Sequence, residues 1–217
     1  MASPRDYKNT IVPNWCPGCG DYGIQNAISA VCAKKGWANE DIPLISGIGC
    51  SSRIGGYQYC YGAHTTHGRA LPFAQGIKCA NKDQHMIVCS GDGDSYAIGL
   101  GHAMHAIKRN MDITYLVFDN QVYGLTKGQT SPASDKGFVT KTTPDGNPLT
   151  PLDAPAMALA AGATFVAQAY AIDSKTMINV IERAVDHKGF SYVNSFSPCV
   201  TFKHLNTVQW YNEHLVK

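Results

Sequence analysis

The chain has 217 residues, a formal net charge of +2 and 44% hydrophobic residues. This length and apolar content suffice for one domain with a buried core, and a near-neutral charge without a long basic run gives no support to nucleic-acid binding. No window is apolar for long enough to span a bilayer, and the first ten residues lack the apolar core of a signal peptide. We therefore expect a single-domain, cytoplasmic protein that binds neither nucleic acid nor membrane.

The N-terminal third alternates between irregular and regular segments. Residues 1–20 predict an irregular arm that ends in a tight Cys16-Pro17-Gly18-Cys19 turn. Asp21 is a suitable N-cap for a helix with one apolar face, which Gly36 would end. A short strand is expected at 43–46, a functional loop without clean periodicity at 55–70, and a helix at 71–80.

The central stretch, 86–129, has the pattern strand, glycine turn, helix, strand. Its first apolar run ends in Gly91-Asp92-Gly93-Asp94 and its second, 113–118, ends in Asp119-Asn120. In parallel α/β sheets ligands bind at the carboxyl ends of the strands, and phosphates favour a glycine turn that opens a helix. Asp92 and Asn120 would then lie side by side as oxygen ligands of Mg²⁺. The pattern predicts a metal-diphosphate site.

The last third predicts the rest of the same sheet. Residues 130–151 are rich in Ser, Thr, Pro, Asp and Gly, which is typical of a lid, a binding segment or an arm to a partner. A short helix at 153–161, a strand at 164–168, a helix capped by Ser174 and a strand at 190–196 follow. This alternation predicts an α/β fold with a doubly wound, mainly parallel sheet and a single domain over 1–217.

Eight cysteines are many for a cytosolic chain, where disulfides are disfavoured and metal ligation becomes the better explanation for some of them. Cys16, Cys19, Cys50 and Cys199 would all fall at the carboxyl edge of the sheet, where four thiolates suit either a [4Fe–4S] cluster or a structural zinc ion. Spacing alone does not choose between these two, and Cys50 and Cys199 could also be unligated core residues. The other four stand among apolar or small neighbours and are expected to pack as small hydrophobes: Cys32, Cys60, Cys79 and Cys89.

Six stretches of the chain carry a further signal when taken together: 15–21, 47–51, 67–70, 91–94, 120–129 and 197–199. They closely resemble one family, the β subunits of 2-oxoacid:ferredoxin oxidoreductases, which carry thiamine diphosphate. The resemblance covers almost the whole chain, in the family's order, and it makes a cluster a better interpretation than zinc. It also implies the thiamine-diphosphate-binding fold.

The resemblance assigns a role to each matched residue. It implies that Cys16, Cys19, Cys50 and Cys199 hold a [4Fe–4S] cluster, and that Asp92, the Asn120 side chain and the Val122 carbonyl hold Mg²⁺. The implied contacts with thiamine diphosphate are Ile48, Gly49, Cys50, Ser51, His67, Gly93, Asp94, Gly124 and Leu125. A locally satisfied loop histidine is the alternative for His67, whereas His102 and His105 are expected to be packing or surface residues.

The implied reaction is the coenzyme A-dependent oxidative decarboxylation of a 2-oxo acid, with electrons passed to ferredoxin. Stretch 123–129 is more similar to the 2-oxoglutarate-type and broad 2-oxo acid members than to the dedicated pyruvate ones. We expect 2-oxoglutarate, giving succinyl-CoA and CO₂ reversibly, with pyruvate or a broad range of 2-oxo acids as the alternative. Lys127 and Arg53 are cations beside the cofactor loops and could bind a substrate carboxylate. A solvated surface charge is nearly as good an interpretation of each.

The glutamate that activates thiamine is expected from a partner. The three glutamates, Glu40, Glu182 and Glu213, lie outside every matched motif, and the resemblance implies an α subunit in an αβ or (αβ)₂ assembly that supplies this group. Relatives usually continue past 210–217 into a C-terminal tail, so the chain is either a short member of the family or lacks that tail. Two rivals remain: a non-redox thiamine decarboxylase or synthase, and a zinc-stabilised assembly subunit.

Overall fold

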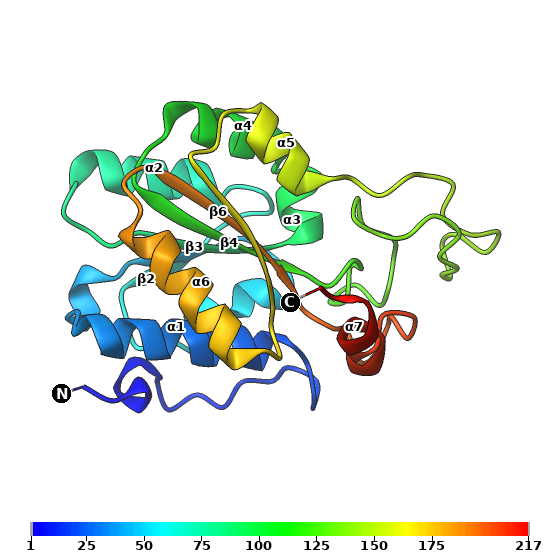
Figure 1. Ribbon diagram of the computed structural model, residues 1–217, viewed down its shortest axis with the longest axis horizontal. Helices are drawn as coiled ribbons and strands as arrows, with labels where there is room; N and C mark the ends of the chain where they lie inside the picture. The colour runs from blue at the N-terminus through cyan, green and yellow to red at the C-terminus, as the bar shows by residue number, and fades with distance from the viewer. Residues whose placement is uncertain (1, 217) are drawn as a thin grey trace.

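A computed structural model describes residues 2–216, which fold around a six-stranded sheet of order β2-β1-β3-β4-β6-β5 (Figure 1). Every neighbouring pair of strands is parallel. This confirms the predicted doubly wound parallel sheet. The strands are Leu44–Ser46 (β1), Gly62–His64 (β2), Ile87–Gly91 (β3), Ile113–Asp119 (β4), Phe165–Tyr170 (β5) and Phe190–Phe196 (β6).

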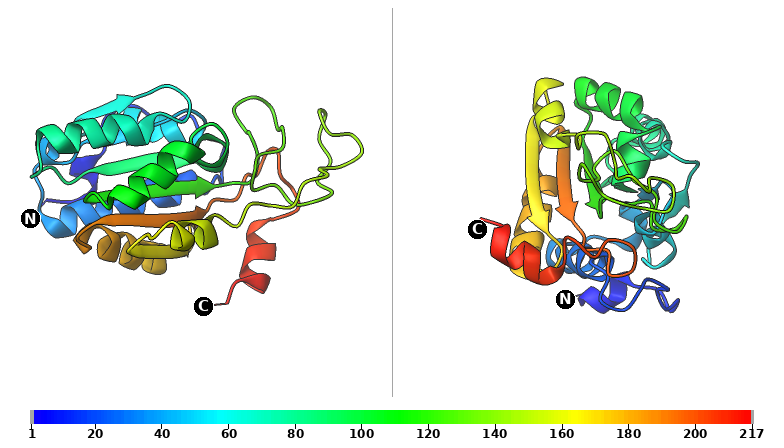
Figure 2. Two further views of the ribbon diagram at one scale, coloured as in Figure 1. Left: turned by 90° about the horizontal axis from the view of Figure 1, so that it is seen from above. Right: turned by 90° about the vertical axis from the view of Figure 1, so that its right-hand side faces the viewer.

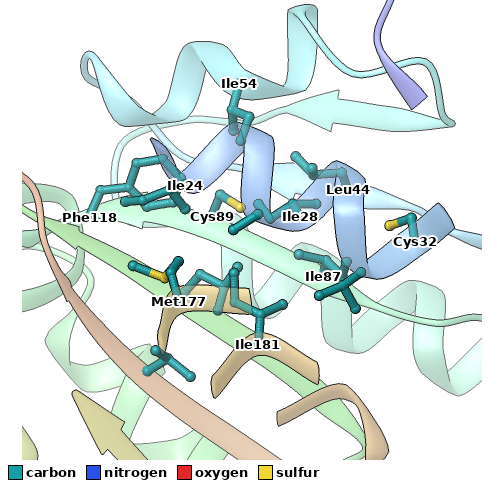
Figure 3. Close-up of a cluster of buried hydrophobic side chains, with 14 of the residues drawn as sticks. Ile24, Ile28, Cys32, Leu44, Ile54, Ile87, Cys89, Phe118, Met177 and Ile181 are labelled. Atoms are coloured by element: carbon teal, nitrogen blue, oxygen red, sulfur yellow. The ribbon is translucent and has the colours of Figure 1, made fainter. Parts of the chain in front are cut away.

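Helices cover both faces of the sheet (Figures 1 and 2). One face carries α1 (Asp21–Lys35) and α6 (Ser174–Asp186), whose apolar residues pack against β1, β3 and β4 (Figure 3). The other face carries α2 (Ala70–Ala80), α4 (Leu100–Arg109) and α5 (Ala154–Ala160). The short elements are α3 (Asp92–Tyr96), α7 (Val208–His214) and the 3₁₀ helices η1 (Pro4–Tyr7), η2 (Asn39–Asp41) and η3 (Ser51–Gly56).

The order of the strands locates the place where a ligand is expected. From β1 the chain moves outward to β2, and it then crosses back through α2 to β3 on the other side of β1. The carboxyl ends of β1 and β3 therefore flank the switch point of the sheet, where open α/β folds bind their ligands. The stretches that follow these strands are the two glycine-rich motifs, 47–51 and 91–94.

Several local predictions need correction. The predicted loop at 55–70 contains β2, a three-residue edge strand, and the helix expected after 91–94 is two helices, α3 and α4. Asp21 is not an N-cap but the first residue of α1, with Gly20 at the cap, and its buried side chain faces the end of β6. Asp173 rather than Ser174 caps α6, because its carboxylate accepts from the Thr176 amide.

Residues 130–151 form the predicted irregular segment, which we call the arm. It projects from the carboxyl edge of the sheet, beyond the body of the domain (Figure 2). Among residues 2–216, none of the helices combines the length and the apolar character that a membrane crossing needs.

Candidate functional site

The two glycine-rich motifs and the segment after β4 enclose one small pocket at the switch point. Its volume is about 70 Å³, well below the roughly 300–1,000 Å³ typical of a complete ligand pocket. The pocket enclosed by this chain alone is therefore smaller than a complete cofactor site. The lining contains every predicted cofactor and magnesium residue: Ile48, Gly49, Cys50, Ser51, His67, Asp92, Gly93, Asp94, Asn120, Val122, Gly124 and Leu125.

Asp92 is a buried carboxylate at the end of β3. It is 1% exposed and accepts a short hydrogen bond from Ser131 Oγ of the arm. Burial raises its pKa, and the nearby Asp119 carboxylate raises it further. A buried carboxylate is costly unless a cation or several donors offset its charge. No lysine or arginine is found among the described residues that line the pocket, so a divalent cation fits this position.

Asp94 joins three loops of the pocket. Its Oδ1 accepts from the Ile48 amide at 3.0 Å and from the Gly68 amide at 2.7 Å, and it lies 3.3 Å from Nδ1 of His67. Its Oδ2 is buried without a hydrogen-bond partner among the described residues. A side chain at Gly47 would place its Cβ 1.8 Å from that oxygen, so the glycine is needed for this close approach. The Asp94 carboxylate therefore holds the loops of Ile48 and Gly68 against the start of α3.

The Asn120-Gln121-Val122 turn follows β4, beside the end of β3 in the parallel register. Asn120 Oδ1 accepts from the Val122 amide at 3.1 Å, and Gln121 has a φ of +58°. A left-handed conformation is uncommon for a residue with a side chain and persists where its surroundings fix it. Ser134 Oγ of the arm donates to the Gln121 carbonyl at 2.6 Å, which is one such contact.

The four predicted cluster cysteines line a second cavity, of about 240 Å³. Within residues 2–216, no three His, Cys, Asp or Glu side chains are grouped so as to hold a single metal ion. A four-iron cluster fills the space between its thiolates, whereas one zinc ion draws its ligands to about 2.3 Å. A cavity walled by four thiols fits the larger group. It is lined by Cys16, Cys19, Cys50 and Cys199.

Close contacts of the N-terminal segment bring these cysteines together. Trp15 is 6% exposed, and its indole N–H donates to the Cys50 carbonyl at 2.6 Å. A Cβ at Gly20 would lie 2.6 Å from Ser197 Oγ, so the CxxC turn packs directly against the end of β6. Ser197 Oγ also donates to Asp21 at 2.7 Å. These contacts place the CxxC turn beside the residues that follow β1 and β6.

The environment of Cys50 shows how near the thiols are to one another. Burial raises the pKa of its thiol to about 11, and Asp21 and the neighbouring Cys199 and Cys16 raise it too. Binding of iron would have to displace the thiol protons, as metal binding to cysteine generally does. Of the cysteines expected to be structural, Cys32 and Cys89 are buried and Cys60 is partly buried. The expectation for Cys79 was wrong, because it lies on the exposed side of α2.

The cations predicted to bind substrate both line the cysteine cavity. Arg53 Nε donates to the Tyr57 hydroxyl at 3.2 Å, and Lys127 is exposed in a left-handed conformation with φ of +84°. His102 and His105 lie on α4, away from both cavities, as expected for packing or surface residues.

The glutamates do not line the cofactor pocket. Glu182 pairs with Lys34 at 2.7 Å on the surface, and Glu213 accepts from Gln209 on α7. Glu40 lies in η2, beside β2 at the far edge of the sheet. None of the three could reach a ligand at the switch point.

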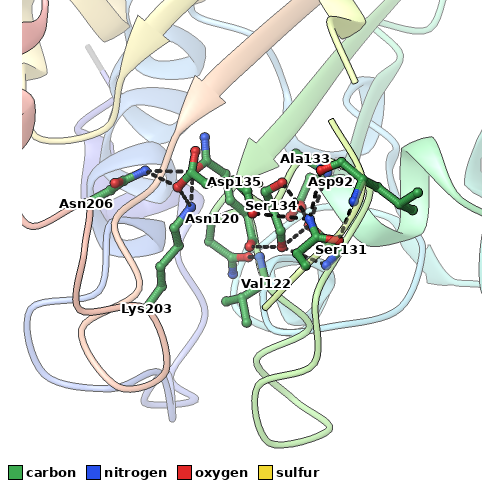
Figure 4. Close-up of polar contacts among 12 residues, drawn as sticks. Asp92, Asn120, Val122, Ser131, Ala133, Ser134, Asp135, Lys203 and Asn206 are labelled. Atoms are coloured by element: carbon green, nitrogen blue, oxygen red, sulfur yellow. Dashed lines mark hydrogen bonds and ion pairs between the residues drawn. The ribbon is translucent and has the colours of Figure 1, made fainter. Parts of the chain in front are cut away.

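Sequence reasoning missed several residues that do not line the pocket but form hydrogen bonds with its loops. Ser131 and Ser134 belong to the arm, and Lys203 to the segment after Cys199, yet all three contact Asp92 or Gln121, in the loops predicted to bind Mg²⁺ (Figure 4). Asp119 was recognised only as the end of a strand, although it is buried and accepts from Asn194 at 2.9 Å. The 131–135 stretch follows the matched motif directly, and this position was the only available signal.

Comparisons with known proteins agree with this geometry. The family model "Thiamine pyrophosphate enzyme, C-terminal TPP binding domain" matches residues 47–195. The chain is 42% identical over 206 residues to the 2-oxoacid:ferredoxin oxidoreductase subunit beta of Saccharolobus solfataricus, covering 94% of this chain and 68% of that one. It is 43% identical over 198 residues to the 2-oxoglutarate oxidoreductase subunit KorB of Mycobacterium tuberculosis, covering 91% and 53%.

A solved structure is similar over nearly the whole chain. It is the 2-oxoglutarate:ferredoxin oxidoreductase from Magnetococcus marinus with 2-oxoglutarate, coenzyme A and succinyl-CoA bound. The TM-score is 0.96 at 43% sequence identity, with 98% of this chain and 73% of that chain covered. The chain therefore belongs to the β subunits of the 2-oxoacid:ferredoxin oxidoreductases, and is a subunit of an oxidoreductase.

Proposed function

We propose that this chain is the β subunit of an enzyme that oxidises 2-oxoglutarate to succinyl-CoA and CO₂ and passes the electrons to ferredoxin. Support for this substrate comes from two relatives, because one is named for 2-oxoglutarate and the solved structure contains 2-oxoglutarate and coenzyme A. Pyruvate or a broad range of 2-oxo acids is the alternative, since the relative from Saccharolobus solfataricus is named only for 2-oxo acids.

One observation carries the proposal: the pocket at the switch point and the cysteine cavity share a wall. Both are lined by Cys50, Asn120, Gly124 and Leu125. A Cβ at Gly124 would lie 3.4 Å from Cys50 Sγ, so the thiol lies directly against the proposed cofactor loop. Side-by-side sites of this kind suit an enzyme in which electrons released at one site leave through the other.

Some residues of the pocket would bind Mg²⁺, and others would contact the diphosphate of the cofactor. Asp92, the Asn120 side chain and the Val122 carbonyl would bind Mg²⁺, which prefers one or two carboxylates together with substrate phosphate. Gly93 and Asp94, at the start of α3, and His67 would lie against the diphosphate. When bound, thiamine diphosphate supplies the carbanion-stabilising chemistry of decarboxylation and a [4Fe–4S] cluster on the four cysteines accepts single electrons.

The small volume of the pocket and the distant glutamates indicate that the site is completed by another chain. The activating glutamate, and the rest of the cofactor pocket, would come from an α subunit in an αβ or (αβ)₂ assembly. The relative from Saccharolobus solfataricus is named a subunit beta, which supports a second chain in the assembly.

Activity with and without the partner tests the proposal. The purified α and β chains are assayed separately and together, under anaerobic conditions, with 2-oxoglutarate, coenzyme A, thiamine diphosphate, Mg²⁺ and ferredoxin. We expect turnover only from the mixture, and faster turnover with 2-oxoglutarate than with pyruvate. Robust oxidation of either 2-oxo acid by the β chain alone would contradict the proposal.

A further inference from the structure

Lys203 is a buried cation beside the proposed magnesium loop. It is 2% exposed and follows Cys199 by four residues. Its ammonium group donates to Gln121 Oε1, lies 2.8 Å from Asp135 Oδ2 and sits 5.5 Å from the centroid of the Phe138 ring. Burying an ammonium group is costly unless its donors are satisfied. The contacts with Gln121 and Asp135 offset that cost for Lys203.

One of these contacts is with Gln121, which stands between two proposed metal ligands, Asn120 and Val122, in the sequence. Asn206 Nδ2 donates to the same Gln121 Oε1 at 2.7 Å, and Ser134 Oγ donates to the Gln121 carbonyl at 2.6 Å. Gln121 is thus fixed by its side chain and its backbone in the left-handed conformation, with φ of +58°. Without such contacts a residue with a side chain would favour a different backbone conformation.

Segment 199–206, which contains Lys203 and Asn206, also packs against the turn that follows the proposed magnesium loop. Phe202 packs against the turn that ends at Gly128, where an added Cβ would lie 3.1 Å from the Phe202 ring. Segment 199–206 therefore contacts the cysteine cavity through Cys199, the proposed cofactor loop through Phe202 and the magnesium loop through Lys203 and Asn206.

We infer that Lys203 and Asn206 are positioning residues, which hold Gln121 in the conformation that presents Asn120 and Val122 to the metal ion. The inference rests on the proposed function, because it assumes that this turn binds Mg²⁺ with thiamine diphosphate. Partners of metal ligands that make no contact with the metal typically contribute about 10–100-fold to its affinity. A loop held in a strained conformation depends on such partners more than an unstrained one.

The test measures affinity rather than turnover. The αβ complex is freed of thiamine diphosphate and Mg²⁺, and calorimetric titration then gives the dissociation constant of thiamine diphosphate at fixed Mg²⁺. We expect Lys203→Met to raise this constant about tenfold or more, with unchanged visible absorbance per chain and kcat near that of the wild type at saturating cofactor. Asn206→Ala, which removes one donor and leaves the cation in place, should raise it by a smaller factor.

A second buried lysine provides a matched control. Lys78 on α2 is 6% exposed, and its ammonium group donates to the Gln84 carbonyl at 2.6 Å and to Asp112 at 3.4 Å, at the opposite edge of the sheet. Lys78→Met should lower the melting temperature but leave the dissociation constant within about twofold of the wild type, since every contact with the metal loop is retained. In a Gln121→Ala background, Lys203→Met should lose most of its effect, because the residue through which it acts is shortened.

Two results would overturn the inference while leaving the proposed function intact. One is a Lys203→Met complex that binds thiamine diphosphate as tightly as the wild type, and the other is an equal loss of affinity in Lys78→Met. If Lys203→Met fails to fold, Asn206→Ala decides, because an unchanged dissociation constant in that variant overturns the inference too. A wild-type complex that binds no thiamine diphosphate would overturn the proposed function itself.

Discussion

Lys127 and Lys203 lie near the same edge of the sheet, but they differ in burial and therefore in whether they can bind a substrate. Lys203 is 2% exposed and contacts Gln121 and Asp135, whereas Lys127 is exposed at the rim of the cysteine cavity. A cation at the rim can bind an incoming carboxylate, while a buried cation with satisfied donors can only hold its neighbours in place.

The position of Lys127 gives a prediction about substrate choice. Replacing it with Ala keeps a Cβ at the same left-handed position, so the backbone strain is unchanged and only the cation is lost. If the ammonium group binds the distal carboxylate of 2-oxoglutarate, kcat/KM for that substrate should fall about tenfold, with little change for pyruvate, which has no distal carboxylate. Steady-state assays of the αβ complex with both substrates measure this.

Lys136→Ala is the control for that prediction. Lys136 is an exposed lysine of the arm that lines neither cavity, so its loss changes the net charge by the same amount without removing a nearby cation. Equal losses for 2-oxoglutarate and pyruvate in Lys127→Ala, or a similar loss in Lys136→Ala, would argue against a distal-carboxylate role.

The candidate ligands could be read from the sequence because each stands just after a strand or in the CxxC turn. The carboxyl ends of neighbouring parallel strands meet at one edge, so Asp92 and Asn120 were placed correctly by pattern alone. Ser131 and Lys203 could not be found in this way. They reach the site from irregular segments, and no periodic pattern records where such a segment folds back.

The elements with a strong apolar pattern were predicted well, and those shaped by tertiary contact were not. The buried runs of β3, β4 and β6 are continuous in the sequence. At the break between α3 and α4, Gly68 approaches Gly99 so closely that a Cβ at Gly68 would lie 2.6 Å from the Gly99 nitrogen. Helical propensity carries no information about that contact.

A pair of helical glycines tests how tightly α1 packs. Alanine is normally favoured over glycine inside a helix by about 1 kcal/mol. At Gly23 on α1, however, an added Cβ would lie 2.0 Å from the Ala171 carbonyl oxygen, so Gly23→Ala should lower the free energy of unfolding by about 1–3 kcal/mol. At Gly76 on α2 nothing lies within 4 Å, and Gly76→Ala should raise it by up to about 1 kcal/mol.

Urea denaturation of the two variants and the wild type measures the difference. Both substitutions add one methyl group to a helix, so helix propensity alone predicts the same sign for both. A stabilised Gly23→Ala variant would show that α1 and the segment before α6 are less tightly packed than the structure indicates.

On the scale of the whole molecule, the sheet brings two cavities to one edge, where they share a wall. The strand order places the ends of β1 and β3 at the switch point, and Trp15 and Gly20 bring the CxxC turn against that same edge. The pocket on the proposed cofactor side has only about 70 Å³, which is why we propose that a partner chain completes it. We propose that electrons released in the pocket at the switch point pass to a cluster held by the four cysteines.

An anaerobic visible spectrum of the αβ complex, with metal analysis, tests that claim most directly. We predict a brown protein in which the cysteines of each β chain bind four irons, whose broad absorbance bleaches when 2-oxoglutarate and coenzyme A are added. Cys199→Ala should lower the iron content and abolish the bleaching, whereas Cys79→Ala, at an exposed position on α2, should change neither. A colourless complex with one zinc ion at these cysteines, or an iron absorbance that does not change while succinyl-CoA forms, would contradict the account.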